Sequence, residues 1–430
     1  MPTYPNMQLK NGLKAYKEDK PEFGHGMLKY YALDPSYINL NNGSYGTTPR
    51  PVTEAVHALS ERIEANPDLF HRIEFKPLLD EARQRVADLI GAKRDEVVFV
   101  ANASMGVNTV LRNFEWEEGD IIFEFRTTYG SISRTVQYLH DRPPHPTAST
   151  INVLFPTTHA EIIEVFKKHV KANPALPNKK RVAVIDSIVS NPGVTLPWKE
   201  LVKICKEEGI FSVIDAAHSI GQEVGVNLKE SDPDFWISNC HKWLSAKRSC
   251  AALYVPERNQ HIIKASIPTS HAYISPKDRK GPNFVEQFDW NGTIDYASYI
   301  TVTDALEFRE WMGGEERLNK YCHDLAIQGG QVLAEIFGTR VMDPNGDLTL
   351  NMVNVELPLP KDLPATVATI SGLHRRLFAK KAFSAPFFHN GAWWTRCSAQ
   401  VWNEISDFEE LGKRWLEVCA DVKKDFDQSK

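Results

Sequence analysis

The chain has 430 residues, which is enough for one large domain with a sizeable core and a smaller second domain. Its formal net charge of -5 and its pI near 6.3 argue against the basic surface that nucleic-acid binding requires. No apolar run is long enough to cross a bilayer, and residues 1–20 lack the apolar core of a signal peptide. We therefore expect a cytoplasmic protein that binds neither nucleic acid nor membranes.

Six cysteines are scattered along the chain without Cys-x-x-Cys or Cys/His ligand spacing. A disulfide framework or a zinc site would need such spacing, so the sequence argues against both, and we predict no metal site. We expect most of the cysteines to be small buried hydrophobic residues.

The first part of the chain predicts a loop followed by helices. Residues 1–36 carry no strong pattern and are expected to wrap the surface or a partner subunit. Residues 38–46 join a short extended piece to Gly43 and Gly46, a composition typical of a tight loop with exposed backbone. This loop is either an ordinary turn or a source of amide donors for a substrate carboxylate. Apolar residues at helical spacing over residues 51–92, interrupted at Asn66, predict two helices.

Strands and helices alternate beyond residue 92. Apolar runs predict strands at residues 97–100, 121–123, 152–154, 182–185, 212–214, 235–237 and 252–255. Helical stretches, such as residues 161–170 and 198–208, lie between most of them. The alternation predicts an α/β fold with a largely parallel sheet covered on both faces. Ligands bind such sheets beyond the carboxyl ends of the strands, so residues directly after the strands are the candidates for a site.

Two segments that follow strands carry groups suited to an anion and a cation. Asn102, Ala103, Ser104 and Met105 open a helix whose free amides suit a phosphate, although Ser104 or Asn102 could equally cap the helix. Asp215 ends a strand, where its carboxylate could cap a helix or pair with a protonated ring nitrogen.

A tyrosine and a lysine also follow predicted strands. Tyr129 could offer a flat face to a ring, a phenol for proton transfer, or plain loop packing. Lys242 stands just past the strand at residues 235–237, where burial would disfavour its ammonium form. The resulting amine could form a Schiff base with an aldehyde cofactor such as pyridoxal phosphate. The alternative is a surface lysine that lies over the ring of Trp243.

These residues together resemble the class V branch of the fold-type I pyridoxal-phosphate enzymes, which includes aminotransferases, cysteine desulfurases and isopenicillin-N-epimerase-like proteins. The resemblance covers residues 37–402 and is carried by residues 40–46, 215–218, 239–244, 291–293 and 395–398. It implies a large, mostly parallel-sheet domain at residues 50–291. From residue 292 to 430, helical stretches such as residues 305–317 and 407–426 alternate with short strands such as residues 351–357, which predicts a smaller α+β domain. Residues 1–49 would form an N-terminal segment that joins the small domain and takes part in a dimer interface.

The resemblance also implies cofactor-binding roles. Lys242 would form the Schiff base and later move the α-proton, Asp215 would pair with the pyridine nitrogen, and His218 would lie near the ring oxygen. Tyr129 fits the position that stacks on the ring, and Asn191 sits where the family approaches the cofactor oxygen or the substrate. The phosphate would be held by Ala103, Ser104, Met105 and His241.

The remaining roles implied by the resemblance concern the substrate and a second subunit. Thr293 looks like the residue that reaches the phosphate of the neighbouring subunit's cofactor, which implies a homodimer with shared sites. Arg396 fits the arginine that takes the substrate α-carboxylate by a bidentate contact. Further substrate-binding candidates are Asn42, Gly43, Ser44 and Trp394.

The sequence favours one reaction among those of the family. Desulfurases use a cysteine shortly before the carboxylate-binding arginine, but residues 343–395 contain no cysteine and Cys397 directly follows Arg396. Residues 23–28, 45–46 and 388–396 resemble fungal lyases of ergothioneine biosynthesis that cleave hercynylcysteine sulfoxide. Such a lyase would release a sulfenic species, pyruvate and ammonia, with Tyr129 as the candidate proton donor.

Two points stay open at this stage. The aromatic run at residues 389–394 could house a trimethylammonium group, or Trp393 and Trp394 could divide between core and surface. A class V aminotransferase or an epimerase-like enzyme is the alternative function. A dinucleotide-binding oxidoreductase is disfavoured, because no Gly-x-Gly-x-x-Gly motif follows a strand.

Overall fold

A seven-stranded sheet lies at the centre of the computed structural model, which describes residues 19–264, 272–275, 277–281, 283–290 and 292–429. The strand order is β2-β8-β7-β6-β5-β3-β4, and β8 runs antiparallel to both of its neighbours while the other pairs are parallel. The strands are β2 (Val97–Val100), β3 (Ile121–Phe125), β4 (Thr147–Ile151), β5 (Arg181–Asp186), β6 (Phe211–Asp215), β7 (Phe235–Asn239) and β8 (Ala251–Tyr254).

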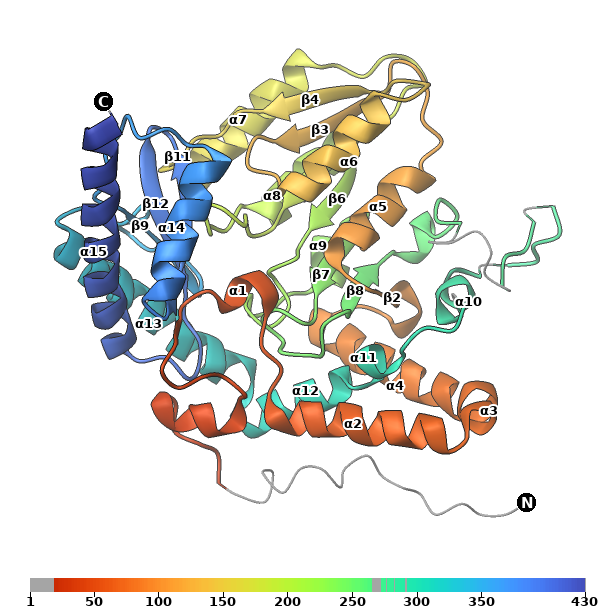
Figure 1. The fold of residues 1–430 in the computed structure, drawn as a ribbon. Coiled ribbons are helices and arrows are strands. Elements are labelled where there is room, and N and C mark those ends of the chain that lie inside the picture. The colour runs from red at the N-terminus through yellow and green to blue at the C-terminus, as the bar shows by residue number, and fades with distance from the viewer. Residues whose placement is uncertain (1–18, 265–271, 276, 282, 291, 430) are drawn as a thin grey trace.

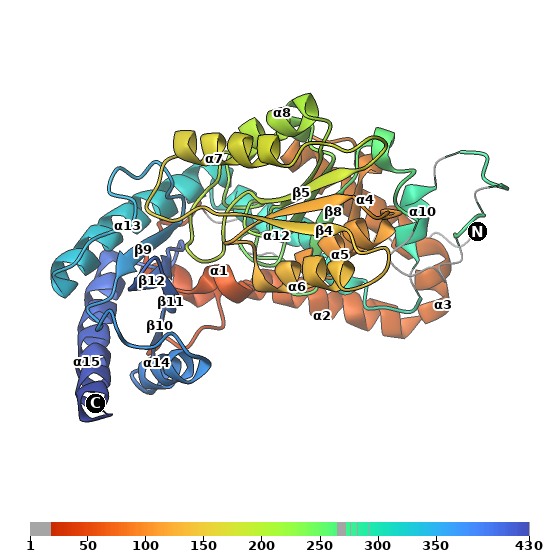
Figure 2. The ribbon, with the colours of Figure 1, turned by 90° about the horizontal axis from the view of Figure 1, so that it is seen from above.

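Helices cover both faces of this sheet (Figure 2). On one face lie α5 (Ala103–Asn113) and α6 (Gly130–His140), and on the other lie α7 (His159–Ala172) and α8 (Trp198–Glu207). Alternate residues of a strand therefore enter different cores: Val97 and Phe99 pack in one apolar cluster, and Val98 and Val100 in another. The predicted α/β architecture, with a mostly parallel sheet, is confirmed.

A smaller layer of strands and helices stands beside the large sheet (Figure 1). Its three antiparallel strands, in the order β11-β12-β9, are β9 (Met352–Glu356), β11 (Ala385–His389) and β12 (Ala392–Ser398). The helices α13 (Gly314–Phe337), α14 (Val367–Ala379) and α15 (Ile405–Ser429) pack with them around a separate apolar cluster. None of the described helices is long and apolar enough to cross a membrane.

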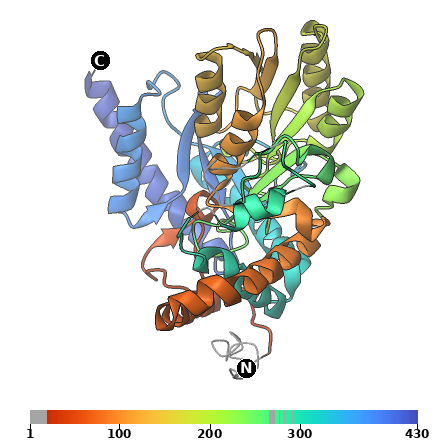
Figure 3. The same ribbon diagram turned by 90° about the vertical axis from the view of Figure 1, so that its right-hand side faces the viewer.

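The N-terminal segment connects the two parts. The strand β1 (Ile38–Asn39) pairs in parallel with β10 (Ala382–Phe383), and the short helix α1 (Asn42–Tyr45) follows directly. The chain then enters α2 (Arg50–Ala65), which lies at the base of the molecule with α4 (Phe75–Ile90), α11 (Ala297–Ile300) and α12 (Val302–Trp311) (Figures 1 and 3). Shorter helical segments are His25–Tyr30, α3 (Pro67–Leu69), Phe70–Glu74, Arg94–Glu96, α9 (Leu228–Ser231), Glu257–Asn259 and α10 (Phe284–Asp289).

Three local predictions were wrong. No strand covers residues 152–154; the edge strand β4 ends just before them, at Ile151. Because β4 pairs only with β3 at the edge of the sheet, its sequence needs no apolar run, and the apolar spacing did not reveal it. A continuous helix over residues 305–317 is broken at Gly313 and Gly314, whose φ values of 107° and 81° suit glycine. Part of the loop predicted at residues 38–46 forms the helical turn α1. Asn291, which opens one of the resemblance motifs, lies outside the described residues, as do residues 1–18.

Candidate active site

A cavity of about 360 Å³ opens at the carboxyl ends of β5, β6 and β7. Asp186, Asp215 and Asn239, the last residues of these three strands, all line it. The cavity therefore lies at the sheet edge where the parallel arrangement predicts a ligand site. The site residues predicted from the sequence that line it are Ser44, Ala103, Ser104, Tyr129, Asp215, His218, His241 and Lys242.

A chain of hydrogen bonds joins Trp243, His218 and Lys242 and influences the protonation of the lysine. The indole N–H of Trp243 donates to Nδ1 of His218 at 3.1 Å, and Nε2 of His218 lies 3.1 Å from Nζ of Lys242. Burial and nearby positive charge hold the pKa of His218 well below its usual value, so the ring is neutral. A neutral ring that accepts at Nδ1 carries its proton on Nε2, so Nζ must be the acceptor.

This arrangement therefore favours the neutral amine form of the lysine. Burial lowers the pKa of Lys242 to about 8, although the nearby carboxylate of Asp215 opposes this shift. A buried amine with a free lone pair is the nucleophile that an aldehyde cofactor needs.

Two buried carboxyl groups lie side by side at the floor of the cavity. Asp186 and Asp215 are paired in register on β5 and β6, and neither forms an ion pair with a described residue. Thr128 donates to Asp186 at 3.2 Å, and the amide of Ala217 donates to Asp215 at 3.1 Å. Burial raises the pKa of both groups, and the neighbouring Asp215 adds to the rise at Asp186. We infer that Asp186 holds a proton and that Asp215, which interacts with Lys242, carries the negative charge.

The residues predicted to bind the phosphate differ in how many of their hydrogen-bond donors are free. Asn239 already accepts from the amide of Ala103 at 2.9 Å, and Asn102 accepts from the amide of Met105 at 2.9 Å. The amide and hydroxyl of Ser104 donate to no other described residue, so they are the groups free for an anion. Met105 does not line the cavity.

His241 would need a proton before it could hold a phosphate. Its Nδ1 lies 2.9 Å from the carbonyl oxygen of Cys250, which can only accept, so Nδ1 carries the ring proton. Burial lowers the pKa of His241 to about 4, which leaves Nε2 as a bare lone pair at neutral pH. A bound phosphate dianion would favour the protonated ring.

These groups fit pyridoxal phosphate. The cavity contains an amine for the aldehyde, a buried carboxylate without a cation for the ring nitrogen, and the free donors of Ser104 for the phosphate. The exposed ring of Tyr129, at the start of α6, lines the same space.

Arg396 lies behind the cavity wall. Its Nη2 donates to Asn41 at 2.8 Å and to Ser44 at 2.7 Å, and its Nη1 donates to the carbonyl oxygen of Ser190 at 2.6 Å. The side chain is buried, forms no ion pair with a described residue, and has an Nε–H without a partner there. Burial lowers its pKa to about 10. In this structure Asn41, Ser44 and Ser190 occupy these donors, and the direct contact of Arg396 with a substrate carboxylate stays a prediction.

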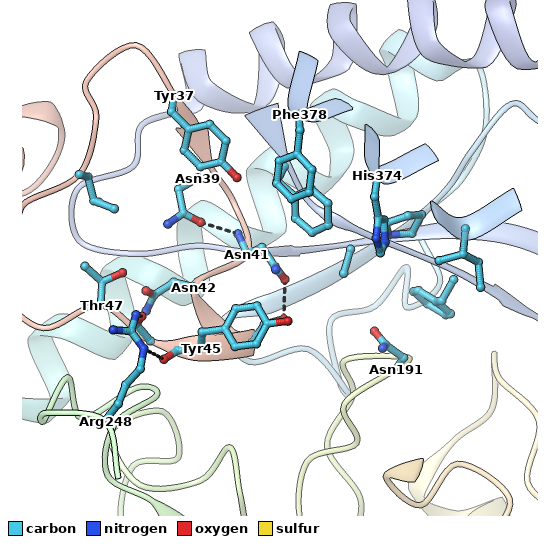
Figure 4. Close-up of a pocket in the computed structure, with 18 residues that line it drawn as sticks. Tyr37, Asn39, Asn41, Asn42, Tyr45, Thr47, Asn191, Arg248, His374 and Phe378 are labelled. Atoms are coloured by element: carbon cyan, nitrogen blue, oxygen red, sulfur yellow. Dashed lines mark hydrogen bonds between the residues drawn. The ribbon is translucent and has the colours of Figure 1, made fainter. Parts of the chain in front are cut away.

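A second cavity of about 710 Å³ adjoins the first at α1 (Figure 4). Asn42 and Asn191 line this larger cavity and not the smaller one, while Ser44 lines both. Gly43 lines neither. A Cβ at Gly43 would come within 2.9 Å of the Trp243 ring, so this glycine allows α1 to pack closely against it.

Trp394 and Thr293 lie away from both cavities. Trp394 is 1% exposed on β12, donates to the carbonyl oxygen of His389 at 3.1 Å, and packs under Arg340. Its strand β12 is paired on both sides and buried at every residue, so Trp394 reaches neither cavity in this arrangement, and its role in substrate binding stays a prediction. Thr293 is exposed, and its predicted contact with a neighbouring subunit stays a prediction.

Sequence reasoning missed several residues that line the smaller cavity, among them Asp186, Ser190 and Asn239. Asp186 directly follows the apolar run at residues 182–185, so the strand-end rule that found Asp215 would have found it as well. Asn239 carries no comparable signal, because its role is to bind the amide of Ala103 from another element.

Comparison with known proteins identifies the family to which this chain belongs. Residues 38–364 match the family described as aminotransferase class-V. The chain is 34% identical to the L-cysteine desulfhydrase-like protein lolT1 of Epichloe uncinata, over 93% of this chain and 96% of that protein. It is 33% identical to the hercynylcysteine sulfoxide lyase of Schizosaccharomyces pombe, over 93% and 98% of the two chains. The cysteine desulfurase of Thermococcus onnurineus NA1 shares the fold, with a TM-score of 0.76, 22% identity, and coverage of 94% of this chain and 100% of that one. The chain therefore belongs to the class V aminotransferase family and is a fold-type I enzyme that uses pyridoxal phosphate.

Proposed function

We propose that this enzyme is a carbon–sulfur lyase that cleaves a cysteine-conjugate sulfoxide, with hercynylcysteine sulfoxide as its substrate. The reaction breaks the bond between the β-carbon and sulfur, consumes one water, and gives a sulfenic acid on the way to ergothioneine, together with pyruvate and ammonia. The observation that carries the proposal is a buried amine with a lowered pKa, Lys242, in a cavity lined by no thiol among the described residues. The similarity to the Schizosaccharomyces pombe protein of that name supports the choice of substrate.

Lys242 is the proposed base for the α-proton. The bound cofactor withdraws electrons from the α-carbon, which acidifies its proton and allows a group on the β-carbon to leave. With a pKa of about 8, roughly a tenth of the Lys242 amine is neutral at pH 7, and His218 fixes the position of its nitrogen.

Tyr129 is the proposed donor of a proton to the sulfoxide oxygen. It lines the cavity and is 49% exposed, so it can reach a substrate that enters from solvent. Once the α-proton has gone, the sulfur group leaves with the electrons of the carbon–sulfur bond and needs a proton, but no nucleophile.

The cysteines do not support a desulfurase. All six are buried as free thiols, as the sequence predicted for most of them. Burial raises the pKa of Cys397, beside Arg396, to about 12, so this thiol stays protonated at neutral pH and is a poor nucleophile.

We also propose that the active enzyme is a homodimer in which Thr293 of one subunit contacts the cofactor phosphate of the other. Thr293 is exposed and lines neither cavity of its own chain, so it is free to face a second copy.

The test measures products from defined substrates. We expect the holoenzyme to form pyruvate from hercynylcysteine sulfoxide and, more slowly, from S-methylcysteine sulfoxide, with at least tenfold less from cysteine. Keto-acid exchange between amino-acid and keto-acid pairs, without pyruvate from any sulfoxide, would instead indicate an aminotransferase.

Two variants assign the roles. Lys242→Ala should lose both pyruvate formation and the visible absorption band of the bound cofactor. Tyr129→Phe should keep that band but slow pyruvate formation by about 100-fold, the usual contribution of a proton donor. Tyr138→Phe is the control, because Tyr138 is an exposed tyrosine on α6 that lines neither cavity.

A further inference from the structure

The larger cavity and the smaller cavity meet at α1. Ser44 and Tyr45 line both, and the larger cavity continues from α1 to α14 and the strands β10 and β11 (Figure 4). A substrate whose α-carbon lies near Lys242 can therefore extend its sulfur substituent past α1 into this second space.

Aromatic side chains form much of the wall of the larger cavity. The rings of Phe378 and Phe383 stack with their centroids 4.5 Å apart and an interplanar angle of 10°, and His374 meets Phe383 edge-on at 5.1 Å. Tyr37 and Tyr45 add further rings (Figure 4). Burial lowers the pKa of His374, so its ring is neutral at neutral pH. None of the described residues that line the cavity is an aspartate or a glutamate.

Asn42 is a buried polar group that lacks a partner. Its side chain is 2% exposed and lines the larger cavity, yet neither its amide oxygen nor its amide nitrogen has a hydrogen-bond partner among the described residues. Buried polar atoms are normally paired, so this amide is available to a ligand both as donor and as acceptor.

A guanidinium group completes the lining. Arg248 donates to the carbonyl oxygens of Tyr45 at 3.2 Å and of Gly46 at 2.7 Å, and it forms no ion pair with a described residue. Its positive charge is therefore available to an anionic group of a ligand.

We propose, resting on the lyase function above, that this larger cavity is the subsite for the sulfur substituent and that it selects an aromatic betaine. A quaternary ammonium group has no N–H to donate and is attracted by aromatic faces, so Tyr37, Phe378 and Phe383 suit it without a carboxylate. The betaine carboxylate pairs with Arg248, and the heteroaromatic ring bonds to Asn42. Small substituents such as S-methyl leave the space unfilled.

The test compares a large and a small substrate in one variant pair. Phe378 is 52% exposed, so Phe378→Ala should fold and keep the visible cofactor band. We expect it to raise the KM for hercynylcysteine sulfoxide about tenfold and to leave S-methylcysteine sulfoxide nearly unchanged. The matched control is Phe388→Ala, because Phe388 is a partly exposed phenylalanine of β11 that does not line the cavity, and it should change neither value.

A binding measurement separates this proposal from the lyase function. By calorimetry with the holoenzyme, trimethylhistidine should bind at least tenfold more tightly than histidine, and Phe378→Ala should abolish the difference. Equal binding of the two compounds, or an equal loss with both substrates, would overturn the subsite. If no sulfoxide yields pyruvate, the lyase proposal fails, while the calorimetry still decides whether the cavity takes a betaine.

Discussion

The protonation of Lys242 depends on the indole of the next residue, Trp243, which acts on the amine through the ring of His218. Because Trp243 donates to Nδ1 of His218, the ring proton stays on Nε2 and faces the lysine amine. Burial lowers the pKa of Lys242 to about 8. An ammonium group at that position would place two donors against each other, so we infer that the hydrogen bond from Trp243 also favours the neutral amine.

Trp243→Phe should therefore raise the pKa of Lys242. Without the indole donor, the proton of His218 can move to Nδ1, and Nε2 can then accept from an ammonium group. We expect the pKa of Lys242 to rise by about one unit, so that the neutral amine appears only at higher pH. The measurement is the pH dependence of the rate at which cofactor-free protein develops the visible band with added pyridoxal phosphate.

Trp415→Phe is the matched control, because this buried indole donates to Ser384 at 2.8 Å in the smaller layer, away from Lys242. It should leave the pH midpoint unchanged. The role assigned to Trp243 is wrong if both variants give the wild-type midpoint.

At the scale of elements, α1 is held against the lysine loop at a point where only glycine fits. Gly46 ends α1 with a φ of 68°, and a Cβ there would lie 1.7 Å from the carbonyl oxygen of His241. The backbone of the N-terminal segment thus runs directly over the backbone that carries Lys242.

Gly46→Ala should separate these two segments. Strain at positive φ alone costs about 1–3 kcal/mol, and the collision adds to it, so we expect a loss of about 3 kcal/mol or more in unfolding free energy. Denaturant unfolding measures this loss, and weaker retention of the cofactor should accompany it. Gly26→Ala is the control, since a Cβ there meets nothing within 4 Å. Similar unfolding midpoints for the two variants would show that the close approach is not essential.

The sequence predicted elements well where a single segment carries its own pattern. The apolar runs that became β2, β5 and β7 are buried at every residue, and the strand-end rule led from the run at residues 212–214, part of β6, to Asp215. The edge strand β4 and the break at Gly313 escaped prediction, because edge pairing and backbone angles leave little trace in apolar spacing. The placement of Arg396 and Trp394 was also not predictable. Both lie on the same side of β12, and what that side meets, α1 at Arg396 and the large apolar cluster at Trp394, depends on contacts distant in sequence.

At the scale of the whole molecule, the homodimer proposal concerns the cofactor phosphate in the smaller cavity. It assigns one contact with this phosphate, that of Thr293, to a second copy of the chain. Thr293→Asp should place a negative charge against the neighbour's phosphate, so the purified variant should retain little cofactor. Absorbance of the bound cofactor measures this.

Mixed dimers decide whether the contact crosses between subunits. A dimer of one Lys242→Ala chain and one Thr293→Asp chain should regain about half of the wild-type activity. Its surviving site would combine the intact Lys242 of one chain with the intact Thr293 of the other. No recovery above the two parent variants would place Thr293 in its own chain's site or remove it from the site altogether.

The position of Arg396 has a consequence for how the enzyme admits its substrate. A carboxylate can reach this guanidinium only after Ser44 and Asn41 give way, and both belong to the short segment that separates the two cavities. Binding of the amino-acid end of the substrate would thus move the segment at Asn41 and Ser44, past which the sulfur substituent must enter the larger cavity. Recognition of the two halves of the substrate would then be a single, concerted event rather than two independent ones.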